Sequence, residues 1–122
     1  MKILVVDDYA TMRRIVRNLL SQIGHVDVEE AGDGIVALQK LRETQFGLVI
    51  SDWNMEPMNG LDLLKQVRAD PKLSGIPFIM VTAESKTDNV VAAKQAGVSN
   101  YIVKPFNAET LGKKLATVFA SA

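Results

Sequence analysis

The chain has 122 residues, 48% of them hydrophobic and 23% charged, with 14 basic and 14 acidic side chains. This length predicts one domain over residues 1–122, and no stretch approaches the roughly 18 apolar residues of a membrane span. Zero net charge argues against nonspecific nucleic-acid binding, which depends on excess Lys and Arg. The first strand candidate begins at Lys2, straight after Met1, which leaves no room for a secretory signal and predicts a cytoplasmic protein. The lack of cysteine excludes thiolate chemistry.

The first βα unit is the clearest. The apolar run 3–6, which ends in Asp7 and Asp8, predicts a strand. Apolar residues then recur at spacings of three and four until Gly24, which is typical of a helix end. This stripe consists of Met12, Ile15, Val16, Leu19, Leu20 and Ile23, and Arg13, Arg14 and Arg17 lie off it.

Two more βα units follow. Residues 26–31 are polar enough for a strand at the edge of a sheet, and a helix follows Gly34. The apolar run 47–52 predicts a third strand, and the helix after Gly60 is ended by the pair 70–71, an Asp and a Pro. The side chains expected to face inward are Val36, Ala37, Leu38 and Leu41 in the second helix and Leu61, Leu64 and Val67 in the third.

The fourth unit has a weakly apolar helix. A strand over 78–81 ends at Thr82, and a helix is expected over about 87–96, with Ser85 and Asp88 placed like a weak capping box. Its inward side chains are small: Val90, Val91 and Ala93. A helix so lightly anchored is the natural candidate for a mobile element.

The fifth unit completes an α/β fold. Residues 101–103 predict a strand that ends in Lys104 and Pro105, and a last helix is expected over about 107–119. Its inward side chains are Leu111, Leu115, Val118 and Phe119. Five successive βα units are typical of a parallel sheet covered by helices on both faces.

The polar residues that end these strands are expected to lie together at one edge of the sheet. In open α/β sheets, ligands bind outside the carboxyl ends of the strands. Strands one, three, four and five end in carboxylates, a hydroxyl and an ammonium group, from Asp7, Asp8, Asp52, Thr82 and Lys104. Three carboxylates that meet there repel one another unless a cation is present or a pKa is shifted.

Oxygen ligands predict Mg²⁺, which takes few protein carboxylates, keeps waters and shares a phosphate. We expect Asp8 and Asp52 to be direct ligands, and Asp7 to bind directly or through water. Zinc is disfavoured because cysteine is absent and the single histidine, His25, lies at the far end of the first helix. A metal and Lys104 facing one carboxylate suit a transferring phosphoryl group, with Asp52 as nucleophile and Thr82 as a hydrogen-bond donor.

Four segments carry a resemblance to a known family. They are Val5-Val6-Asp7-Asp8, Ser51-Asp52-Trp53-Asn54-Met55, Met80-Val81-Thr82-Ala83-Glu84 and Val103-Lys104-Pro105-Phe106. The chain resembles the receiver domain of bacterial two-component response regulators over its whole length, and in particular the stand-alone chemotaxis regulators. The resemblance implies a flavodoxin-like doubly wound (βα)5 fold with strand order 2-1-3-4-5, and no effector domain.

The resemblance also implies roles for single residues. Asp52 would accept the phosphoryl group, with Mg²⁺ held by Asp7, Asp8, Asp52 and the backbone carbonyl of Asn54. Lys104 would pair with the phosphoryl group, and the Lys104-Pro105 bond would be cis. Thr82 and Tyr101 would form the switch: Thr82 moves toward the phosphoryl oxygen, and Tyr101 turns into the vacated space.

Partner binding is expected at the face formed by helix four, strand five and helix five. Residues 1–60 carry a net charge of −3 and residues 61–122 one of +3, with a lysine cluster on these two helices. The cluster consists of Lys86, Lys94, Lys113 and Lys114. The resemblance implies a sensor histidine kinase and the flagellar motor switch protein as partners of a monomer, with a separate phosphatase as a further partner. The predicted contacts are Val90, Lys94, Tyr101, Val103 and Lys114.

One position departs from the family pattern. The family usually has proline four residues after the phosphoacceptor, whereas here Glu56 stands there and Pro57 follows. Two interpretations stay open: Glu56 faces solvent, or its carboxylate enters the acidic edge and alters Mg²⁺ affinity.

Three other functions compete with the phosphorylation-activated switch. A phosphate sink or adaptor for a shared kinase would have the same sequence features. A Mg²⁺-dependent phosphatase of the haloacid dehalogenase type needs a second Asp two residues after the nucleophile, and Asn54 cannot supply that proton. A flavin carrier would want a Ser/Thr/Gly-rich phosphate loop after strand one, where Asp7 and Asp8 would repel the phosphate.

Overall fold

Five parallel strands form the sheet of this computed structural model, which describes residues 1–83 and 87–120. They are β1 (Ile3–Val6), β2 (Val28–Ala31), β3 (Leu48–Asp52), β4 (Phe78–Thr82) and β5 (Asn100–Val103). Their order is β2-β1-β3-β4-β5, as expected for a flavodoxin-like sheet, and the winding direction reverses between β1 and β3.

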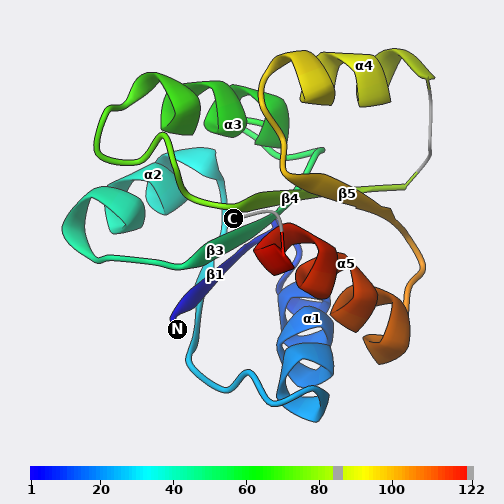
Figure 1. Cartoon of the computed structure of the whole chain (residues 1–122). Coiled ribbons are helices and arrows are strands. Elements are labelled where there is room, and N and C mark those ends of the chain that lie inside the picture. Colours follow the sequence, from blue (N-terminus) through cyan, green and yellow to red (C-terminus); the bar gives the residue numbers. More distant parts are fainter. Residues whose placement is uncertain (84–86, 121–122) are drawn as a thin grey trace.

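Helices cover both faces of the sheet (Figure 1). They are α1 (Ala10–Gln22), α2 (Gly34–Glu43), α3 (Gly60–Ala69), α4 (Thr87–Gln95) and α5 (Ala108–Ala120). Figure 1 shows α1 and α5 on one face and α2, α3 and α4 on the other. None of the helices within the described ranges has the length and apolar character that crossing a bilayer requires.

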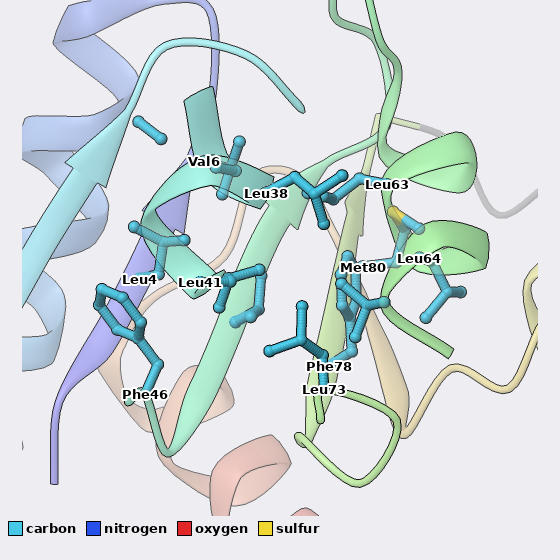
Figure 2. Close-up of a cluster of buried hydrophobic side chains, with 14 of the residues drawn as sticks. Leu4, Val6, Leu38, Leu41, Phe46, Leu63, Leu64, Leu73, Phe78 and Met80 are labelled. Atoms are coloured by element: carbon cyan, nitrogen blue, oxygen red, sulfur yellow. The ribbon is translucent and has the colours of Figure 1, made fainter. Parts of the chain in front are cut away.

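The strands alternate their side chains between two apolar clusters. In β1, Ile3 and Val5 pack toward α1 and α5, whereas Leu4 and Val6 pack toward α2 and α3. This period of two is the geometry of an extended chain, and burial on both faces explains why the strands are almost wholly apolar. Figure 2 shows the second cluster, including Leu4, Val6, Leu38, Leu41, Phe46, Leu63, Leu64, Leu73, Phe78 and Met80.

Strand β2 lies at the edge of the sheet, as its charged residues predicted. Glu29 and Glu30 are half-buried. Glu29 forms ion pairs with Lys2 at 3.0 Å and with Lys40 at 3.5 Å. Charged side chains on an edge strand oppose pairing with the sheet of another molecule.

Several predicted details are wrong. The strand expected from residue 26 begins at Val28, and Val26 is 75% exposed. Val36 lies on the exposed side of α2, because the buried stripe of that helix runs through positions 34, 37, 38 and 41. Ile15 is exposed on α1, and Leu63 takes the buried position that was expected of Leu61. In the three helices the period and most of the buried stripe were predicted correctly, and the errors lie at the margins of the stripe.

Helix α4 is only lightly buried along its described side chains. Val91 is exposed, Val90 is half-buried, and Ala93 is buried. Beyond the helix, Arg68 of α3 donates from Nε to the carbonyl of Gly97 at 2.8 Å and from Nη1 to that of Ile76 at 2.6 Å. The predicted capping residue Ser85 lies outside the described residues, as do Glu84, Lys86 and the side chain of Asp88.

Candidate functional site

The sheet register brings the acidic residues together at the carboxyl ends of its central strands. Val6 of β1 is paired with Ser51 of β3, so Asp7 and Asp52 follow one step further along neighbouring strands. Carboxylate oxygens of Asp7, Asp8 and Asp52 lie within 4.8 Å of one another. Asp52 therefore shares one site with Asp7 and Asp8, from which it is distant in the sequence, as the strand ends predicted.

Lys104 supplies the positive charge of this site. It follows β5, and its Nζ lies 2.9 Å from Oδ1 of Asp52 and 3.8 Å from Oδ2 of Asp7. Asp7 is 4% exposed and Asp52 is 7% exposed, whereas Asp8 is exposed. One ammonium group thus faces two buried carboxylates, and the charge of the site remains negative. The expected cis peptide between Lys104 and Pro105 is present.

Burial disfavours the ionised form of Asp7. Loss of solvent raises the pKa of the Asp7 carboxyl above its usual value, and the neighbouring charge of Asp52 raises it further. A hydrogen bond of 2.9 Å from the Tyr9 backbone N–H to Oδ1, and the charge of Lys104, act in the opposite direction. The net effect is a raised pKa, because burial outweighs the stabilisation that this hydrogen bond and Lys104 give to the carboxylate.

The donor set fits a hard divalent cation. All three groups offer carboxylate oxygens, which Mg²⁺ prefers, and two of the three are buried beside each other. Next to them, Asp8, Asn54, Glu56 and Asn59 line a cleft of about 370 Å³. This cleft provides room for the water and phosphate ligands that Mg²⁺ retains.

Backbone packing around Asp52 requires glycine at position 60. The Gly60 N–H donates to the Trp53 carbonyl at 2.9 Å, and the Trp53 N–H donates to the Val81 carbonyl at 3.0 Å. A Cβ atom at Gly60 would clash with the carbonyl oxygen of Asp52. The start of α3 is therefore pressed against the backbone of the nucleophile candidate.

The predicted switch residues lie beside each other. Thr82 is 8% exposed. It lines a small cavity of about 10 Å³ together with Trp53, Val90, Ala93 and Tyr101. The ring of Tyr101 is half-buried, and Nζ of Lys114 lies 5.2 Å from its centroid. The space between Thr82 and Tyr101 is thus bounded by α4.

The predicted partner face is partly assembled by these contacts. The cavity and the cation–π contact join Val90, Tyr101 and Lys114, which come from α4, β5 and α5. Lys94 is exposed on α4, and Val103 is half-buried on β5. In the lysine cluster, Lys113 forms an ion pair with Glu109 at 3.3 Å, and Lys86 lies outside the described residues.

Sequence reasoning missed one residue near the acidic site. Nη1 of Arg13 donates to the backbone carbonyl of Asp7 at 2.6 Å, although its place off the apolar stripe gave no sign of this contact. A cavity of about 560 Å³ between the ends of α2 and α3 was also not expected. It is lined by Leu41, Phe46, Asp70 and Leu73 among others, and none of the acidic site residues contributes to it.

Residues 3–116 match the family model of the response regulator receiver domain. The chain belongs to this family. It is 53% identical over 119 residues to chemotaxis protein CheY-3 of Vibrio cholerae, covering 98% of this chain and 92% of the relative. It is 50% identical over 119 residues to chemotaxis protein CheY of Pseudomonas aeruginosa, covering 98% and 96%.

Solved structures agree with this assignment. The chemotaxis protein CheY4 of Vibrio cholerae has a TM-score of 0.89 at 38% identity, with 96% of this chain and 97% of that chain covered. A putative response regulator from Chloroflexus aurantiacus has a TM-score of 0.91 at 28% identity, with 98% and 97% covered. This chain is therefore a CheY-like receiver domain, a signalling switch and not a conventional enzyme.

The raised pKa of Asp7 predicts how stability depends on pH in the absence of metal. Protonated Asp7 favours the fold at acid pH, and this contribution is lost as the pH rises through the raised pKa. Asp7→Asn should therefore unfold at higher urea concentration than the wild type near neutral pH in EDTA, and the difference should shrink at acid pH. Mg²⁺ should stabilise the wild type more than the variant.

The exposed Asp27 provides the control, because Asp27→Asn also removes a carboxylate but lies outside the acidic site. Lower stability of Asp7→Asn in EDTA at neutral pH would contradict the argument.

Proposed function

We propose that this chain is a phosphorylation-activated chemotaxis response regulator that accepts a phosphoryl group from a sensor histidine kinase on Asp52. The observation that carries the proposal is the 2.9 Å contact between Nζ of Lys104 and Oδ1 of Asp52 within the cluster of three acids. Asp7, Asp8, Asp52 and the backbone carbonyl of Asn54 hold Mg²⁺. The site acts within a single receiver domain, in the cytoplasm.

Transfer proceeds by attack of one Asp52 carboxylate oxygen on phosphorus. The bond from phosphorus to the kinase histidine nitrogen breaks, and its electron pair returns to the imidazole. Lys104 stays next to the accepting carboxylate, where its ammonium group neutralises charge on the phosphoryl oxygens. Mg²⁺ held by Asp7, Asp8 and Asp52 would supply further positive charge during the transfer.

The reverse half of the cycle uses the same residues. The oxygen of a water attacks phosphorus, the bond to Asp52 breaks, and inorganic phosphate leaves a regenerated carboxylate. This self-dephosphorylation is performed by the chain itself, and a separate phosphatase is a candidate partner.

Phosphorylation is read through Thr82 and Tyr101. The Thr82 hydroxyl moves to hydrogen-bond a phosphoryl oxygen, and Tyr101 turns inward into the vacated space. Support comes from the cavity that both residues line with Val90 and Ala93 of α4, since any movement of Thr82 there changes the packing of α4. The target then binds the face that contains Val90, Lys94, Tyr101, Val103 and Lys114, and the flagellar motor switch protein is the proposed target.

The nucleophile is tested with Asp52→Asn. The variant should show no incorporation of phosphate from a small-molecule phosphodonor in the presence of Mg²⁺, whereas Asp27→Asn should be labelled like the wild type. Phosphorylation of Asp52→Asn at the wild-type rate would overturn the assignment.

A pull-down with and without beryllofluoride, which mimics the aspartyl phosphate, tests the output. Capture of a motor switch protein only with beryllofluoride supports the motor role, and no capture favours a phosphate sink.

Glu56 is proposed to tune the metal site. Its side chain is exposed and lines the same cleft as Asp8, so its charge should favour a cation there. Glu56→Ala should weaken Mg²⁺ binding roughly threefold to tenfold, as expected when one carboxylate is lost from the cleft beside the ion. Calorimetric titration measures this, with Glu43→Ala as the exposed acidic control. Unchanged affinity would leave Glu56 as a solvent-facing residue.

The partner face is tested by charge reversal. Lys94→Glu with Lys114→Glu should weaken binding of the beryllofluoride form to an acidic motor switch peptide by about tenfold or more, because rim charges set attraction to the partner. Lys65→Glu changes an exposed lysine on α3 and should bind like the wild type. Equal affinity of all variants would place the partner elsewhere.

A further inference from the structure

Arg13 joins the acidic site to the edge of the sheet. Its Nη1 donates to the backbone carbonyl of Asp7 at 2.6 Å, and its Nε donates to Oε1 of Glu30 at 3.0 Å. The Arg13 side chain is 20% exposed. One planar guanidinium thus contacts both the loop between β1 and α1 and the strand β2.

Glu30 is itself held by a second arginine. Nη1 of Arg17 lies 2.7 Å from Oε2 of Glu30, and Nη2 of Arg17 donates to the carbonyl of Val28 at 2.9 Å. Partial burial alone would raise the pKa of Glu30, but hydrogen bonds from Arg17 and Arg13 hold it below its usual value. Glu30 therefore remains ionised at neutral pH and provides a lasting partner for Arg13.

The hydrogen bond from Arg13 to the Asp7 carbonyl restrains the backbone conformation at the acidic site. The carbonyl oxygen of Asp7 and the N–H of Asp8 belong to one planar peptide group. A hydrogen bond that holds this oxygen also restricts the rotation of the whole plane. It therefore restricts the position from which the Asp8 side chain leaves the backbone.

We propose that Arg13 is a positioning residue for the metal site, and that Glu30 keeps Arg13 in place. The proposal rests on the Mg²⁺ binding proposed above. It makes a prediction opposite in sign to that of simple electrostatics. Loss of a positive charge near a cation site should by itself strengthen Mg²⁺ binding, whereas loss of the positioning contact should weaken it.

The test is Mg²⁺ titration of the purified full chain without phosphodonor, followed by calorimetry and by the fluorescence of Trp53, the single tryptophan, which adjoins Asp52. Arg13→Met should raise the Kd by about tenfold or more, as for other groups that orient metal ligands. Arg17→Met is the matched control, because it also removes one positive charge and one hydrogen bond to Glu30, but Arg17 makes no contact with Asp7. This variant should bind Mg²⁺ within about twofold of the wild type.

Two further variants separate geometry from charge and from folding. Arg13→Lys keeps the charge but cannot span both partners with a planar fork, so its Kd should also rise. Glu30→Gln should raise the Kd by a smaller factor. Circular dichroism establishes that each variant is folded at the temperature of the titration, and Arg13→Lys provides the measurement if Arg13→Met does not fold.

The outcomes distinguish this proposal from the one on which it rests. Equal or tighter Mg²⁺ binding by Arg13→Met and Arg13→Lys, or an equal loss in Arg17→Met, overturns the role of Arg13 and leaves the receiver function intact. Absence of Mg²⁺ binding by the wild type overturns both. Weaker binding confined to the Arg13 and Glu30 variants supports the positioning role.

Discussion

The mutual repulsion of three carboxylates at the carboxyl edge of the sheet is the constraint on which the rest of the site depends. Asp7 and Asp52 are buried on neighbouring strands, and only Lys104 among the described side chains lies in ion-pair contact with them. The parallel fold makes this arrangement unavoidable, because the ends of β1 and β3 are in register. A site with unbalanced negative charge favours the binding of a cation. The carboxylates that the fold brings together are thus the basis of the proposed chemistry of the site.

The fold and the centre of the site could be predicted because their signals lie within short segments. Apolar runs ended by Asp52, Thr82 or Lys104 predicted both the strands and the residues delivered to one edge of the sheet. Burial on both faces makes such runs apolar throughout, and parallel strands place their ends together. The strand order was implied by the resemblance of these same segments to a known family, and the structure has that order.

The remaining details depend on contacts between distant segments, which spacing does not encode. A helical period does not say which residue lies at the margin of the buried stripe, so Leu61 was predicted to face inward, whereas Leu63 is buried. Arg13 lies off the apolar stripe of α1, and its bond to the Asp7 carbonyl depends on how the loop before α1 folds back. The cleft beside Glu56 likewise arises only when the loop after β3 is placed next to Asp8.

The hydrogen bond from Nε of Arg68 to the carbonyl of Gly97, just beyond α4, restrains the C-terminal end of this helix. A helix of nine residues is about 13 Å long at 1.5 Å per residue. A tilt of about 10° around the Arg68 end would therefore displace the Thr87 end by roughly 2 Å, while the residues near Gly97 would hardly move. A small change in the packing around Thr82 and Tyr101 would then move the N-terminal end of α4 more than its C-terminal end. The proposed partner face would therefore change its shape most near Thr87.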